Sequence, residues 1–116
     1  MAAVIAVTAG ACSLNRAPKI EENVYPTEYK AQIIKQMRLQ SESSRLNLRD
    51  AYVAPPLMKA YQSTARYVSC LRFTIQEERR EMAAFFFNGA LTQIVDATPE
   101  LCANAAYEPF PDLQKL

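Results

Sequence analysis

The sequence has no histidine and, among its 116 residues, only two glycines, Gly10 and Gly89. A chain without histidine lacks the commonest general base and cannot form a Ser-His or Cys-His pair. Two isolated glycines cannot build a glycine-rich loop that cradles phosphates. With no histidine, two distant cysteines do not make a zinc site. We therefore expect a protein that is not an enzyme and that uses neither a metal nor another cofactor.

Acidic residues offer another route to catalysis, but their positions favour ordinary roles. Asp50 and Asp96 stand near the ends of predicted strands, and Glu77–Glu81 form a predicted charged turn. Nothing marks two of them as the carboxylate pair of a glycosidase, and solvated or capping roles are the simpler interpretation. A small carboxylate-based enzyme is kept as an alternative hypothesis.

The sequence has no large excess of either positive or negative charge, because 13 basic and 12 acidic residues give a formal net charge of +1. The chain therefore has no overall field that would attract nucleic acid, and we expect no nucleic-acid partner. Half of the residues are hydrophobic, which is typical of a folded globular domain rather than a disordered chain. The length suits one domain with a modest core.

The first twelve residues, Met1–Cys12, form an uncharged apolar run that ends in small residues and a cysteine. This pattern is typical of the apolar region and cleavage site of a secretory signal peptide. Ala9-Gly10-Ala11-Cys12 looks like a bacterial lipobox, although no Lys or Arg precedes Arg16. We expect residues 1–11 to be a signal-peptide remnant, Cys12 to be lipidated, and residues 12–25 to be a tether.

A buried strand is the alternative interpretation of the same segment. Residues 3–7 could form a core strand followed by a turn at Gly10, in which case the chain would be an intracellular single-domain interaction protein. The apolar run is too short to cross a bilayer, which takes about 20 residues. Deletion of residues 1–11 would separate the two hypotheses, because only a core strand is needed by the fold.

The cysteines are consistent with export. If Cys12 carries lipid, Cys70 and Cys102 remain, and in an oxidising periplasm they would form one disulfide. The alternative is that both are buried, reduced thiols that behave as small hydrophobic residues.

The remaining chain, residues 26–116, is predicted to be a single α+β domain. A helix starts at Pro26 or Thr27 and ends between residues 39 and 43, because apolar side chains recur at helical spacing. Strands are expected where apolar residues alternate or cluster between turn signals: 46–54 at an edge, 66–76, 82–87 and 90–96. Asn88-Gly89 predicts a tight hairpin, and Thr98-Pro99 predicts the start of a short helix. The expected fold is an N-terminal helix packed on a three- to four-stranded antiparallel meander, with a short C-terminal helix and an extended tail.

Three aromatic residues are candidates for contact with a partner. In the run Phe85–Phe87 the middle ring, Phe86, must point away from its neighbours in a strand. Tyr107 and Phe110 belong to a proline-rich tail that could occupy another protein's groove. Packing of the tail over its own sheet is the alternative.

The chain resembles small alphaproteobacterial envelope lipoproteins of uncharacterised function. The resemblance rests on Cys12 in its small-residue box, Arg66–Phe73, Asp96–Cys102 and the Pro-Phe-Pro tail. It implies a periplasmic location and a membrane anchor, and Ser13 is similar to residues that permit sorting to the outer membrane. We expect a non-enzymatic lipoprotein that binds or scaffolds another envelope protein, with assembly of outer-membrane proteins as one specific variant.

Overall fold

The computed structural model describes residues 23–41 and 45–116. The predicted signal-peptide remnant, the lipidation site Cys12 and most of the predicted tether lie outside these residues. So does part of the region in which the helix is expected to end, and the alternative core strand over residues 3–7.

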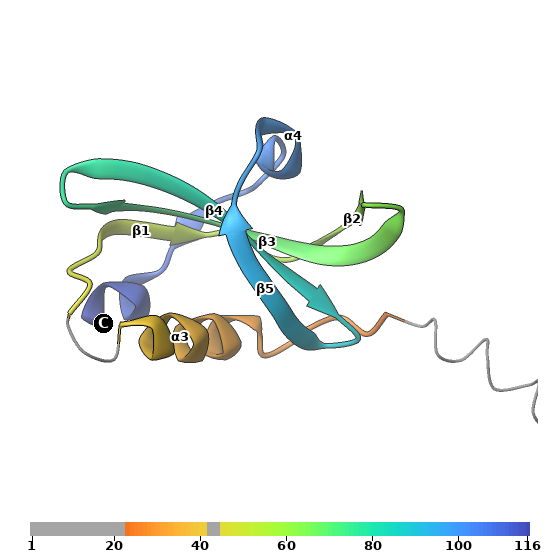
Figure 1. The fold of residues 1–116 in the computed structure, drawn as a ribbon, viewed down its shortest axis with the longest axis horizontal. Coiled ribbons are helices and arrows are strands. Elements are labelled where there is room, and N and C mark those ends of the chain that lie inside the picture. The colour runs from red at the N-terminus through yellow and green to blue at the C-terminus, as the bar shows by residue number, and fades with distance from the viewer. Residues whose placement is uncertain (1–22, 42–44) are drawn as a thin grey trace, which may run out of the picture.

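Most of the described chain is a six-stranded antiparallel sheet. Its strands are β1 (Arg49–Val53), β2 (Leu57–Tyr61), β3 (Thr64–Ile75), β4 (Glu78–Phe87), β5 (Ala90–Asp96) and β6 (Glu108–Pro109). The strand order is β5-β4-β3-β1-β6, and β2 also pairs with β3 (Figure 1). Since β4 occupies one edge of β3, β1 and β2 follow one another along the other edge.

Among the described helices, only α3 (Tyr29–Gln40) has more than five residues. It has 12 residues, whereas α4 (Pro99–Cys102) is a single turn and η1 (Pro111–Lys115) is a 3-10 helix. The side chain of Thr98 accepts a hydrogen bond from the backbone of Leu101, so α4 begins with the cap and the proline that the sequence predicts.

The predicted fold class is wrong. The structure is mostly a six-stranded antiparallel sheet with one helix of 12 residues among the described residues, and not a helix on a three- to four-stranded meander. Two strands are not among the predicted ones: β2 lies between the predicted strands 46–54 and 66–76, and β6 lies in the tail. The tail is not simply extended either, because η1 follows β6.

Three two-residue turns connect the strands from β2 to β5. Both residues have positive φ in Gln62-Ser63, Gln76-Glu77 and Asn88-Gly89, as a type I′ hairpin turn requires. The predicted Asn-Gly hairpin is therefore confirmed. The predicted charged turn over Glu77–Glu81 is wrong, because the turn is at Gln76-Glu77 and the strand β4 already begins at Glu78.

Both faces of the sheet are covered. On one face, Ile33 and Met37 of α3 and Leu113 of η1 pack with sheet residues that include Leu71 and Phe86. On the other face, Leu101 and Cys102 of α4 pack with Val68, Cys70 and Phe85. The alternation predicted for β3 is confirmed, because its side chains divide between the two clusters. The cluster under α3 contains Tyr67, Leu71, Phe73 and Ile75, and the cluster under α4 contains Val68 and Cys70.

Candidate functional site

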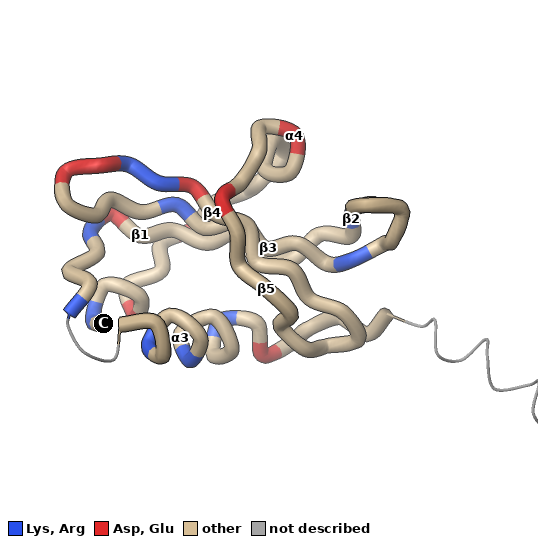
Figure 2. Tube along the Cα trace, in the orientation of Figure 1, with Lys and Arg blue, Asp and Glu red and all other residues tan. Residues whose placement is uncertain are grey.

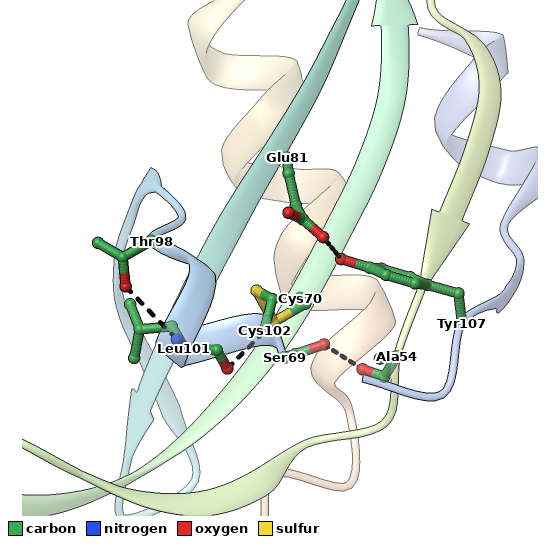
Figure 3. Close-up of a disulfide and its surroundings, with 8 residues drawn as sticks. All are labelled: Ala54, Ser69, Cys70, Glu81, Thr98, Leu101, Cys102 and Tyr107. Carbon is green, nitrogen blue, oxygen red and sulfur yellow. Dashed lines mark hydrogen bonds between the residues drawn. A yellow bond between two sulfur atoms is a disulfide. The ribbon is translucent and has the colours of Figure 1, made fainter. Parts of the chain in front are cut away.

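A disulfide joins Cys70 in the middle of β3 to Cys102 at the end of α4 (Figure 3). The two Cα atoms are 5.9 Å apart and the two residues are separated by 32 positions in the sequence. Both cysteines are buried. The bridge fixes the short helix α4, which has few hydrogen bonds of its own, to the centre of the sheet.

Beside the disulfide, Arg72 of β3 lies between two tyrosine rings. Its guanidinium carbon is 4.2 Å from the ring centre of Tyr107 and 5.0 Å from that of Tyr52. Each contact is within the range of a cation–π interaction, which contributes about 0.5–2 kcal/mol. The Arg72 Nε atom is buried and has no hydrogen-bond partner in the described part of the chain. The aromatic contacts therefore take the place of an ion pair.

Tyr107 is also fixed at its polar end, because its hydroxyl donates a hydrogen bond to Glu81 of β4 (Figure 3). Burial raises the pKa of the Tyr107 phenol, and the hydrogen bond to Glu81 and the negative charge of that residue raise the pKa further. A phenol held in its neutral form is a poor base and nucleophile. Arg72, Tyr107 and Glu81 thus attach the segment after α4 to the sheet, and the arrangement does not prepare a reactive group.

The other acidic candidates are engaged in separate interactions. Asp96 accepts a hydrogen bond from Arg80 at 3.0 Å, and Glu77 lies 3.4 Å from Arg49. Asp50 has positive φ at an irregularity in the pairing of β1 with β3, which is the position of a β-bulge. No group of three or more Cys, Asp or Glu side chains within residues 23–41 and 45–116 is placed to hold a metal ion.

The aromatic residues predicted to meet a partner are mostly inside the protein. Phe86 is fully buried and Phe110 is 3% exposed, and both belong to the cluster under α3. Tyr107 is partly buried against Arg72. The tail therefore packs over its own sheet, and the rings of Phe86 and Phe110 are not accessible contact residues.

Sequence reasoning missed a basic groove between α3 and η1. Its volume is about 580 Å³, and its apolar lining residues are Ala31, Ile34 and the largely buried Phe110. Four basic residues line it, Lys30, Lys35, Arg38 and Lys115, together with Glu28 and Asp112. The excess of positive charge beside apolar lining residues makes this groove a candidate binding site among the described residues.

Two of the four basic residues in the groove are already paired. Lys30 is 3.7 Å from Glu108 and Lys115 is 3.4 Å from Asp112, with all four side chains well exposed. Such exposed pairs contribute about 0–1 kcal/mol and rearrange readily. Lys35 and Arg38 make no ion pair with another described residue.

No protein-family model, curated protein or solved structure matches the chain. The described residues contain no helix that is long and apolar enough to span a membrane.

Proposed function

We propose that the protein is an exported, lipid-anchored binding component of the bacterial cell envelope. The observation that supports this most is the disulfide between Cys70 and Cys102, because stable structural disulfides form in oxidising compartments and are rare in the cytosol. The pairing leaves Cys12 as the third cysteine, directly after the apolar run and the small residues Ala9-Gly10-Ala11. That is the position at which a lipobox cysteine receives its lipid.

The disulfide also weighs against the intracellular alternative. A reducing cytosol would keep Cys70 and Cys102 as thiols, and α4 would then be held to the sheet by side-chain packing alone. The outer-membrane-assembly variant loses support from the fold, because the expected helix on a three- to four-stranded meander is not the observed structure.

The groove between α3 and η1 is the proposed contact surface for another envelope protein. Ala31 and Ile34 in its lining suit an apolar side chain, and Lys35 and Arg38 suit carboxylates. We therefore propose an extended acidic segment as the occupant. The groove has no arrangement of residues for catalysis, so the proposed role is binding and scaffolding.

The test of the binding role is recovery of a complex from gently solubilised membranes. Wild-type protein should retain a defined partner, and K35E/R38E should lose it, because the double charge reversal repels an acidic segment. The matched control is R45E/R79E, which makes the same change of charge at two exposed residues outside the groove. Equal recovery with wild type and K35E/R38E would refute the groove as the contact surface.

A further inference from the structure

The strand β2 has a free edge in the described part of the chain. It pairs with β3 on one side, and no other described strand pairs with it on the other side. The two-residue turn at Gln62-Ser63 determines which backbone groups lie on that edge. The residues that flank such a turn, Tyr61 and Thr64, exchange hydrogen bonds, and bonded and non-bonded pairs then alternate along the ladder. The backbone N–H and C=O groups of Met58 and Ala60 therefore point away from β3.

The outer edges of β1 and β5 are protected, in contrast to that of β2. Beside β1 lies the strand β6, and the Gln114 side chain accepts a hydrogen bond from the Ala51 N–H at 2.9 Å. Beside β5, the Gln32 side chain accepts a hydrogen bond from the Leu91 N–H at 2.8 Å, and an extra residue in β5 forms a bulge against β4. Covering elements and bulges are usual ways of protecting a sheet edge. Within residues 23–41 and 45–116, nothing bonds to the outer edge of β2.

Apolar side chains of β2 are exposed on both faces of the sheet. Met58 is 47% exposed and points to the α3 face, because its partner Tyr67 packs against the cluster under that helix. Leu57 is 43% exposed and points to the α4 face, because its partner Val68 belongs to the cluster under α4. A strand with a free backbone edge and exposed apolar side chains is a template for another strand. The surface to be covered is thus the edge of β2 and not one face of the sheet.

The charge beside this edge favours an acidic partner. Lys59 of β2 lies directly opposite Arg66 of β3 on the α4 face, and like charges at such a position destabilise a sheet. The Arg66 guanidinium carbon is 5.6 Å from the ring centre of Phe87. Residues 51–76 contain no Asp or Glu, and Figure 2 shows basic but no acidic residues along β2 and the adjoining part of β3. An acidic side chain on the outer side of Lys59 would compensate the two positive charges.

A second copy of β2 does not meet this requirement. If two β2 strands paired antiparallel through Met58 and Ala60, the two-fold axis would place the Lys59 side chains of the two copies directly opposite one another, which is unfavourable. Moving the axis by one residue would place either Pro56 or Gln62 in the ladder. Pro56 has no N–H to donate, and Gln62 has positive φ in the turn. The geometry thus favours a strand of different sequence.

We infer that the free edge of β2 binds an extended segment of another protein in which an acidic residue stands between two apolar residues. The segment adds to the sheet as a strand and runs antiparallel to β2, as β6 does to β1. Its two apolar residues exchange backbone hydrogen bonds with Met58 and Ala60, and its acidic residue lies opposite Lys59. Because successive side chains alternate, the apolar ones lie on the α3 face and the acidic one on the α4 face. The inference depends neither on the groove between α3 and η1 nor on the lipid anchor.

The first test measures binding of a fluorescein-labelled peptide, Ser-Thr-Val-Glu-Val-Leu-Thr-Ser, to the full-length chain carrying Cys12→Ala. Fluorescence anisotropy should report saturable binding. N-methylation of both valines should abolish it, because their N–H groups donate to the Met58 and Ala60 carbonyls. N-methylation of the glutamate and the leucine is the matched control and should leave binding unchanged, since those N–H groups point away from β2. No binding of the unmodified peptide, or equal binding of the two methylated peptides, would overturn the inference.

The second test exchanges the charges across the contact. Lys59→Glu should weaken binding of the peptide about ten-fold, because an attraction becomes a repulsion, and a peptide with lysine in place of glutamate should restore it. Arg45→Glu makes the same change of charge away from β2 and should leave binding unchanged. K35E/R38E should also bind normally, and a loss of binding there would place the peptide in the groove instead. Equal binding by wild type and Lys59→Glu would count against the proposed register.

Hydrogen exchange locates the bound segment. In the free protein the amide protons of Met58 and Ala60 should exchange fast and that of Lys59 slowly, because only Lys59 donates to β3. Saturating peptide should slow exchange at Met58 and Ala60. Protection along β5 instead would place the peptide at the other edge of the sheet and refute the inference. Protection of Met58 and Ala60 before peptide is added would refute it as well, because another part of the chain or a second copy would already occupy the edge.

Discussion

Removal of the disulfide is expected to cost a large share of the stability of the domain. The bridge spans 32 sequence positions, and the chain-entropy treatment gives a stabilisation of about 3.7 kcal/mol at 25 °C for a loop of that length. A domain of this size is stable by about 5–14 kcal/mol in total. C70A/C102A should therefore lower the free energy of unfolding by about 3–4 kcal/mol and leave the sheet folded.

Alanine is the suitable replacement, because both cysteines are buried and a hydroxyl would need a new hydrogen bond. The assay is urea unfolding followed by far-UV circular dichroism, for wild type with and without reductant and for C70A/C102A. Reduced wild type should lose nearly as much stability as the variant. A loss below about 1 kcal/mol in both samples would refute the chain-entropy argument, and insensitivity of wild type to reductant would show that the bridge is not formed.

Three further predictions concern local interactions. Gln62-Ser63→Asn-Gly should stabilise the protein by about 1 kcal/mol in urea unfolding, because both positions have positive φ and Asn-Gly is the preferred type I′ pair; a loss of stability would contradict the turn. Arg72→Ala should destabilise by about 1–3 kcal/mol through the lost aromatic contacts, whereas Arg72→Lys should lose less, and equal losses would show that the contacts contribute nothing. Because burial and Glu81 raise the pKa of Tyr107 above its ordinary value of 10.0, the contribution of Tyr107 to stability is full below pH 10 and is lost above it as the unfolded chain ionises. The fall in unfolding free energy above pH 10 should be shallower in Tyr107→Phe, and an unchanged slope would refute this assignment.

Local chemistry could be predicted from the sequence where one or two residues decide the structure. Asn88-Gly89 determines its turn because few other pairs adopt positive φ at both positions without strain. Thr98 and Pro99 determine where α4 begins, since one caps the helix and the other suits its first position. The alternation along β3 was visible because the strand is long and lies in the middle of the sheet.

The errors come from places where distant contacts outweigh local preference. Gln62-Ser63 and Gln76-Glu77 form the same turn as Asn88-Gly89 without its signature residues, because the long ladders on both sides impose it. The strand β2 follows two prolines and has no alternating pattern, so pairing with β3 defines it. Those two errors account for much of the difference between the predicted meander and the observed sheet.

The candidate site was beyond prediction for a related reason. The groove brings Lys35 and Arg38 of α3 to the same surface as Lys115 of η1, about two thirds of the chain away in sequence. On α3 alone, these basic residues are only a solvated helix face. For Phe86 the sequence was informative, because it correctly indicated that this ring points away from the rings of its neighbours. Only the structure shows that α3 and η1 belong to the cluster that buries it.

The intact mass of the protein purified from membranes of its native host tests the proposed lipid anchor most directly. We expect a mass that lacks all residues before Cys12 and carries a diacylglyceryl or triacyl addition. The disulfide between Cys70 and Cys102 should make this mass two hydrogen atoms lower than that of the reduced protein. A protein in the soluble fraction with residues 1–11 intact and no lipid on Cys12 would contradict the anchor, and with it the assignment to the cell envelope.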